Sequence, residues 1–115
     1  SALEKTGDHE GAKQAYQDIL QKYPQAAITR GLLAEIFINE GKNDDAVALL
    51  RTGVASDPNA PLLHRTLASA LERTGNVAEA VREYREYARL NPGAADAKTM
   101  EDRAARLEAR VAQSS

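Results

Sequence analysis

Apolar side chains recur along most of the chain at the three- and four-residue spacing that places them on one face of a helix. Leu63, Leu67 and Leu71 follow this spacing. Short polar stretches that contain glycine or proline separate one such segment from the next. The pattern predicts an all-α chain with helices over about residues 1–6, 9–22, 25–40, 44–56, 60–74, 77–90 and 95–112.

Three glycines divide these helical segments at a constant interval. Gly7, Gly41 and Gly75 are evenly spaced, since 41 − 7 = 34 and 75 − 41 = 34. An alanine, a large side chain and a proline follow each glycine at fixed distances: Ala12, Ala46 and Ala80, then Tyr16, Leu50 and Tyr84, and finally Pro24, Pro58 and Pro92. Four features in register over three copies indicate an internal repeat.

Each of these recurring positions has a physical role in a helical hairpin. Glycine ends a helix with a left-handed residue at little cost, so we expect positive φ at Gly41 and Gly75. Proline ends the second helix of each pair, and the small alanines let the two helices approach closely. Asp8, Asn43 and Asn76 are the expected N-caps of the helices that follow the glycines.

This period, combined with a helix–turn–helix unit, resembles the tetratricopeptide repeat family. The resemblance implies an α-solenoid, a right-handed superhelix of antiparallel helix pairs. Residues 1–115 would form a single domain of this kind. We expect a partial first repeat over 1–25, a second over 26–59, a third over 60–93 and a capping helix over 94–113, whose apolar stripe is Met100, Ala104, Leu107 and Val111.

The chain departs from the family pattern in two kinds of position. Arg30 and His64 stand where the family has an early tryptophan, and Ile19, Gly53 and Tyr87 stand where it has a late alanine. We expect the local packing around these positions to differ from the usual repeat.

Composition excludes several classes of function. The net charge is −2, which gives no general attraction to nucleic acid, and no apolar run is long enough to span a membrane. The chain has no cysteine, and its histidines, His9 and His64, have no second ligand at metal-binding spacing. We therefore expect no enzyme, no metal and no cofactor. The alanine- and arginine-rich composition is typical of a bacterial protein.

The resemblance implies that the first helix of each pair lines a concave groove that holds a peptide or helix of another polypeptide. The groove positions mapped from the family are Ile28, Glu35, Ile38, Asn39, Leu62, Arg65, Ser69, Glu72, Arg73, Arg103 and Arg106. Four arginines and two glutamates give 4 − 2 = +2, which favours an acidic partner with an apolar anchor. Alternatively, these charges pair across adjacent helices, Glu35 with Arg65 and Glu72 with Arg106.

Some family members hold a terminal carboxylate with a lysine and asparagine clamp. The first helices of the second and third repeats contain no lysine, and Asn39 stands alone, so we do not expect binding to a chaperone tail.

Two other functions stay open. The chain begins within a repeat, so we expect it to be part of a longer protein, and whether an enzyme, a membrane anchor or more repeats lie upstream stays open. Without a full first helix, Tyr16, Ile19 and Leu20 lack cover, and this N-terminal edge would favour a homo-oligomer or a structural spacer.

Overall fold

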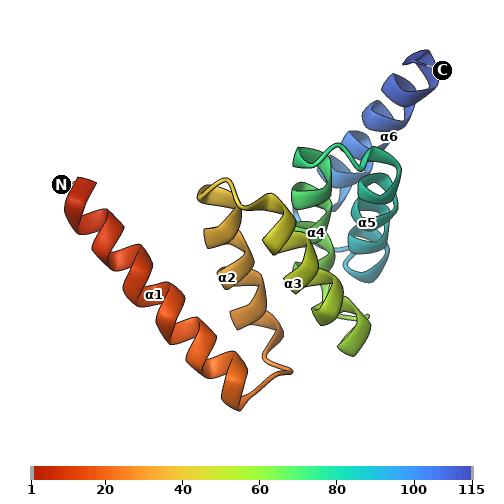
Figure 1. Cartoon of the computed structure of the whole chain (residues 1–115). Helices are drawn as coiled ribbons and strands as arrows, with labels where there is room; N and C mark the ends of the chain where they lie inside the picture. Colours follow the sequence, from red (N-terminus) through yellow and green to blue (C-terminus); the bar gives the residue numbers. More distant parts are fainter. Residues whose placement is uncertain (1, 115) are drawn as a thin grey trace.

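A computed structural model describes residues 2–114 of the chain, and the side chains of residues 10–113. Within these residues the chain forms helices only, as the sequence predicts (Figure 1). They are α1 (Ala2–Lys22), α2 (Ala27–Asn39), α3 (Asn43–Ser56), α4 (Pro61–Arg73), α5 (Val77–Leu90) and α6 (Ala97–Ser114).

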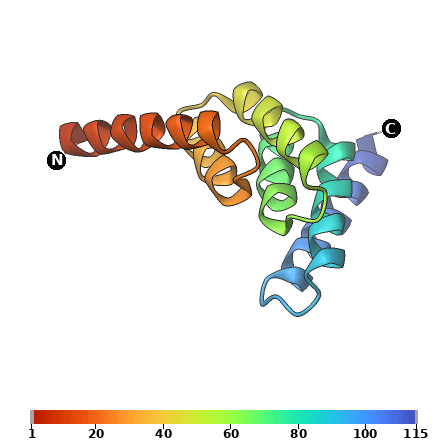
Figure 2. The ribbon, with the colours of Figure 1, turned by 90° about the horizontal axis from the view of Figure 1, so that it is seen from below.

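Successive helices pack against each other in an antiparallel row, and α2 also packs against α4 (Figure 2). The hairpins α2–α3 and α4–α5 repeat each other, because their first helices begin at 27 and 61 and their second helices at 43 and 77. Both intervals equal the spacing of the glycines, since 61 − 27 = 34 and 77 − 43 = 34. The predicted repeat of helical hairpins is confirmed.

The glycine turns within the two hairpins have the expected geometry. Gly41 has a φ of 80° and Gly75 a φ of 86°. The N–H of Gly41 donates to the carbonyl of Ile38 (3.0 Å), and the N–H of Lys42 donates to that of Phe37 (2.8 Å). This pair of bonds is a Schellman motif, which satisfies the last carbonyls of α2 while the chain turns back.

The predicted break at Gly7 is wrong. The expected helices 1–6 and 9–22 form one continuous helix, α1, so Asp8 lies inside a helix and is not an N-cap. A glycine costs a helix interior about 1 kcal/mol relative to alanine but does not end it. Gly41 and Gly75 end helices because the flanking segments bury apolar faces against each other, whereas the N-terminal part of α1 extends away from the other helices (Figures 1 and 2).

The predicted asparagine cap at Asn43 is wrong, whereas Asn76 occupies the N-cap position of α5 as predicted but makes no capping hydrogen bond with its side chain. α3 begins at Asn43 itself, so Lys42 occupies the cap position, and no side chain caps either α3 or α5. Asn76 precedes α5, but its amide donates to the hydroxyl of Thr74 (2.9 Å). Glu79, three residues after Asn76, forms an ion pair with Arg51 of α3 (2.6 Å).

The core lies between the helices of the two hairpins and continues to α6. Ala46 and Ala80 have no exposed surface, which agrees with their predicted role as spacers between paired helices. In α6, Ala104 and Leu107 are buried, but Val111 is 42% exposed, so the apolar stripe of this helix is shorter than predicted.

The departures from the repeat pattern at Arg30 and Gly53 explain each other. Arg30 is only 8% exposed, and its guanidinium donates to the carbonyls of Pro24 (2.8 Å) and Leu49 (3.2 Å). A Cβ at Gly53 would lie 2.4 Å from Cδ of Arg30. Residue 53 therefore has to be glycine so that the arginine can enter.

We predict that Gly53→Ala destabilises the protein by about 1–3 kcal/mol, because the new methyl group overlaps Arg30. Gly11→Ala is the matched control. Gly11 is also helical, nothing lies within 4 Å of its added Cβ, and the substitution should stabilise the protein by roughly 0.5–1 kcal/mol. Urea denaturation measures both free energies of unfolding, and equal effects of the two substitutions would contradict the packing of Arg30 against residue 53.

Candidate functional site

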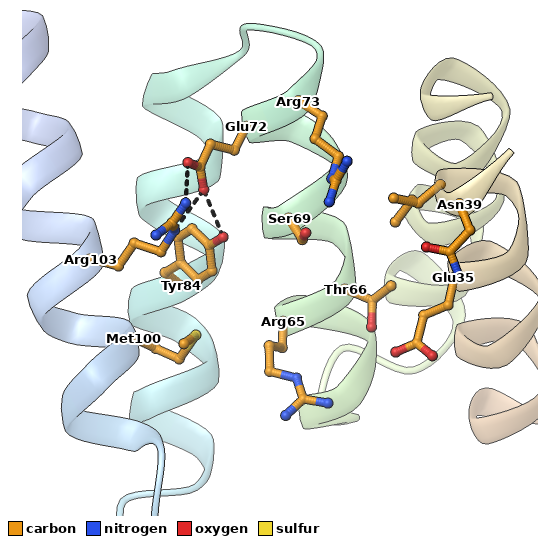
Figure 3. Close-up of a pocket in the computed structure, with 11 residues that line it drawn as sticks. Glu35, Asn39, Arg65, Thr66, Ser69, Glu72, Arg73, Tyr84, Met100 and Arg103 are labelled. Atoms are coloured by element: carbon orange, nitrogen blue, oxygen red, sulfur yellow. Dashed lines mark hydrogen bonds and ion pairs between the residues drawn. The ribbon is translucent and has the colours of Figure 1, made fainter. Parts of the chain in front are cut away.

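A groove of about 710 Å³ lies between α2, α4 and α6. Because α2 and α4 pack side by side one repeat apart, corresponding positions on these helices face the same side of the molecule. The groove is lined by Glu35, Ile38, Asn39, Arg65, Thr66, Ser69, Glu72, Arg73, Tyr84, Met100 and Arg103 (Figure 3). Most of these come from α2 and α4, the first helices of the two hairpins.

Most of the predicted groove residues line this groove. They are Glu35, Ile38, Asn39, Arg65, Ser69, Glu72, Arg73 and Arg103. Three others do not. Ile28 is 68% exposed near the start of α2, Leu62 packs against Gly31, and Arg106 lies on an exposed part of α6.

The sequence did not identify Thr66, Tyr84 and Met100 as groove residues. Tyr84 was predicted to fill a packing position, and its side chain is indeed buried, but its hydroxyl reaches the groove. The signal available in the sequence was the contrast with Leu50, the residue one repeat earlier, which has no hydroxyl. Met100 belongs to the apolar stripe of α6 and is only partly buried, so its side chain also contributes to the groove wall.

A hydrogen-bonded cluster closes the α6 side of the groove (Figure 3). Glu72 accepts hydrogen bonds from Nε (2.8 Å) and Nη2 (2.5 Å) of Arg103, and from the hydroxyl of Tyr84 (2.9 Å). The predicted pairing of Glu72 with Arg106 is therefore wrong. Burial alone would raise the pKa of Glu72, but these hydrogen bonds hold it below its usual value. Burial, together with Glu72, raises the pKa of Tyr84 to about 12.

A second cluster holds Arg65 at the end of the groove. Its guanidinium donates to Asp96 (3.0 Å) and lies over the ring of Tyr87 (5.7 Å), whose hydroxyl also donates to Asp96 (2.5 Å). The hydrogen bond from Tyr87, with that from Arg65, lowers the pKa of Asp96. The predicted pairing of Glu35 with Arg65 is therefore wrong as well.

These clusters change the expected charge of the groove. Three arginines and two glutamates line it, so the balance is 3 − 2 = +1 rather than the +2 expected when Arg106 was included. Arg65, Glu72 and Arg103 already have ion-pair partners. Among the described side chains, Glu35 and Arg73 have no ion-pair partner, and both point into the gap between α2 and α4 (Figure 3).

No group of three or more His, Asp or Glu side chains among the described residues is arranged to hold a metal ion. Within residues 2–114, every helix is too short or too polar to cross a bilayer. His9 lies outside the residues whose side chains the structure describes.

Comparison with protein families gives one match, to the model of the tetratricopeptide repeat, over residues 3–70 and 40–110. The two segments together span nearly the whole chain. No curated protein matches the sequence.

Solved structures with the same fold include several domains of this family, all with low sequence identity. The first such domain of Spaghetti (RPAP3) bound to an HSP90 peptide has a TM-score of 0.79 and 17% identity, over 91% of this chain and 83% of that one. The Yersinia enterocolitica type III secretion chaperone SycD with a peptide of the translocator YopD has a TM-score of 0.77 and 19% identity, over 99% and 88%. The second domain of human RPAP3 with an HSP70 peptide has a TM-score of 0.73 and 18% identity, over 90% and 86%.

We predict that Glu72→Gln destabilises the protein by about 1–2 kcal/mol at pH 7, because it removes the charged partner of Arg103. The pKa of Glu72 is lowered on folding, so its stabilising effect is present above about pH 4.5 and is lost as the pH falls through the folded pKa. The difference between variant and wild type should therefore disappear near pH 3.

Glu108→Gln is the matched control. It also breaks an Arg–Glu pair that involves α6, but both side chains of the Arg85–Glu108 pair are largely exposed, so its effect should be negligible. Guanidinium denaturation at several pH values measures both variants. A loss for Glu72→Gln that persists at pH 3 would show that its ion pair is not the cause.

Proposed function

Because this chain belongs to the tetratricopeptide repeat family, we propose that it is a protein–protein interaction module whose groove between α2, α4 and α6 binds a peptide or a helix of a partner protein. Domains of this family are generally non-catalytic binding modules. The observation that carries the proposal is the groove itself, which has unpaired polar side chains from two successive repeats on its walls.

The size of the groove supports this proposal. Its volume of about 710 Å³ lies within the range of ordinary ligand pockets and is large enough for a few residues of a peptide. The structures with the same fold include domains in complex with an HSP90 peptide, an HSP70 peptide and a peptide of a secretion translocator. Their identity to this chain is too low to name its partner.

The charges without partners define the peptide that the groove would prefer. The guanidinium of Arg73 can bind one carboxylate of a peptide, and the carboxylate of Glu35 can bind a cation or accept a hydrogen bond from an amide N–H. Asn39 and Ser69 lie at the positions one repeat from Arg73 and Glu35, since 73 − 39 = 34 and 69 − 35 = 34. The groove therefore fits a segment with both an acidic and a basic or amide side chain better than a purely acidic one. Ile38 and Met100 supply contacts for an apolar anchor.

Selection of peptides from a random library against the purified chain tests this function. Selected peptides should lose at least tenfold in affinity on Ser69→Trp, because the indole occupies the groove, and this loss corresponds to about 1.4 kcal/mol. Arg82→Glu on α5 is the control, since Arg82 is exposed and does not line the groove. Binding that survives Ser69→Trp but is lost on Arg82→Glu would place the binding site elsewhere.

Charge reversal at Arg73 tests the preference separately. Arg73→Glu should lower the affinity for peptides that have a carboxylate at one position and raise it for peptides with a lysine or arginine at that position. Raising the salt concentration should reduce both effects. Isothermal titration calorimetry measures the change. If the variant selects the same peptides with the same affinity, the groove binds without the use of Arg73.

Self-association is a second candidate function, and exposed apolar side chains favour it. Ile19, Tyr23, Ile28 and Leu32 are exposed at the end of α1 and the start of α2. A second copy of the chain could cover them, because apolar surface of this kind favours association. Light scattering after size exclusion should give a dimer that Ile28→Glu with Leu32→Glu converts to a monomer. A monomeric wild type at high micromolar concentration would eliminate this candidate.

A further inference from the structure

The α1–α2 end of the row lacks one contact that the next hairpin has. In that hairpin, α4 packs against α2, α3 and α5. One repeat earlier, α1 and α3 take the places of α3 and α5 beside α2, but within residues 2–114 no helix takes the place that α2 occupies beside α4 (Figure 1). Part of α1 and α2 is therefore uncovered at this end of the row.

The uncovered residues of α2 correspond to covered residues of α4. Leu62 packs on Gly31 of α2, and Thr66 is only 4% exposed. The residues one repeat before them are Ile28 and Leu32, which are 68% and 37% exposed. Isoleucine and leucine are no more polar than leucine and threonine, so the residue types do not explain the difference. It comes from the neighbouring helix that α4 has and α2 does not.

The uncovered face continues onto α1. Leu50 and Tyr84 are buried because the first helix of their own hairpin covers them. Tyr16, at the equivalent position of α1, is only half-buried, and Ile19 is 38% exposed. Among the described side chains, the hydroxyl of Tyr16 has no hydrogen-bond partner, whereas that of Tyr84 donates to Glu72. The end face is the name given below to Tyr16, Ile19, Ile28 and Leu32.

We propose that the end face binds one helix of a partner protein, which packs on α1 and α2 as α2 packs on α3 and α4. Stacked helical repeats bury their apolar faces against neighbouring helices, and an exposed apolar patch favours such a contact. None of the end-face residues lines the groove, so this interaction goes beyond the proposed peptide binding and does not depend on it.

The contact between α2 and α4 defines one residue that the partner helix needs. Gly31 is the residue of α2 that faces Leu62, and a Cβ on it would lie only 3.1 Å from Cδ2 of Leu62. Ile28 is the residue one repeat before Leu62 and is of similar size. The partner helix therefore needs a small residue, glycine or alanine, where it crosses Ile28.

The contact between α4 and α5 defines a second residue. Glu72 of α4 accepts a hydrogen bond from Tyr84, so we expect a carboxylate of the partner helix to accept one from the equivalent Tyr16. Position 31 corresponds to position 65 of α4, since 65 − 31 = 34, and Glu72 follows position 65 by seven residues. The carboxylate should therefore follow the small residue by seven positions, which is about two helical turns.

Two apolar positions between them are the same in both first helices. Leu33 and Leu67 lie two residues after positions 31 and 65, and Ala34 and Ala68 lie three residues after them. All four are at most 3% exposed. The partner segment is therefore an amphipathic helix with a small residue, then leucine and alanine two and three positions later, and a carboxylate at the seventh.

A second copy of this chain does not offer such a helix. In each copy the matching faces of α2 and α4 are already buried, so they could reach a neighbour only if the core opened. Self-association would cover the end face through other side chains. The helix that fits the end face in the register of the repeat therefore comes from a different protein.

A synthetic peptide tests this inference on the whole chain. The peptide has the sequence of residues 60–75 with Arg65→Ala, which combines the small residue with Leu67, Ala68 and Glu72. Isothermal titration calorimetry should detect binding. Leu32→Glu in the protein should lower the affinity by about tenfold or more, because it places an unpaired charge in an apolar contact. Arg82→Glu on α5 introduces the same side chain elsewhere and should leave the affinity unchanged.

Three results would overturn the inference. One is the absence of binding up to about 1 mM peptide, where an affinity is too weak for a specific contact. Another is binding that Ser69→Trp abolishes and Leu32→Glu leaves intact, which would place the peptide in the groove and leave the proposed function standing. The third is a wild-type dimer in light scattering that the peptide does not dissociate, because a second copy would then occupy the end face.

A double-mutant cycle tests the register of the bound helix. Tyr16→Phe in the protein and Glu72→Ala in the peptide should each lower the affinity by about fivefold, because each removes the same hydrogen bond. Combining them should cause little further loss, since residues in contact are not additive. Losses that add in full would show that this hydroxyl and this carboxylate do not meet, and would overturn the proposed packing.

Discussion

The burial of one face of α4 is the constraint on which the remainder of this molecule depends. Leu63, Leu67 and Leu71 are at most 2% exposed, because α2, α3 and α5 all pack against this helix. Its opposite face is therefore left to Arg65, Ser69 and Arg73, which form the floor of the groove. The hydrophobic effect that places α4 at the centre also determines which of its side chains a partner can reach.

The second consequence of this arrangement is that the groove walls are not equally available for binding. On the α6 side, Glu72 is bonded to Arg103 and Tyr84, so a ligand would have to displace internal hydrogen bonds to use these groups. On the α2 side, Glu35 and Asn39 are exposed. Contacts with α2 and the end of α4 therefore require less rearrangement than contacts with α6.

Sequence reasoning succeeded where a single local cause determines the structure. The constant repeat period and the positive φ of Gly41 and Gly75 follow from side-chain size and backbone freedom. The groove positions came from the family resemblance, and most of them line the groove because the repeat places equivalent helices side by side. It failed where several partners compete. Glu72 could reach a basic residue at more than one position of α6, and only the packing of that helix in three dimensions selects Arg103. The predicted helix break at Gly7 is wrong for a similar reason, because a glycine ends a helix only where the packing of the flanking segments stabilises the turn.

The pairing of Arg30 with Gly53 also bears on how the repeats are ordered along the array. The backbones of the two hairpins are alike, so in principle either could occupy the place of the other. Their side chains do not permit this, because the later hairpin has Tyr87 at the position that corresponds to Gly53 and Glu83 at the one that corresponds to Leu49. An engineered array that duplicates or permutes these hairpins would have to move residues 30, 49 and 53 as one set, and residues 64, 83 and 87 as another.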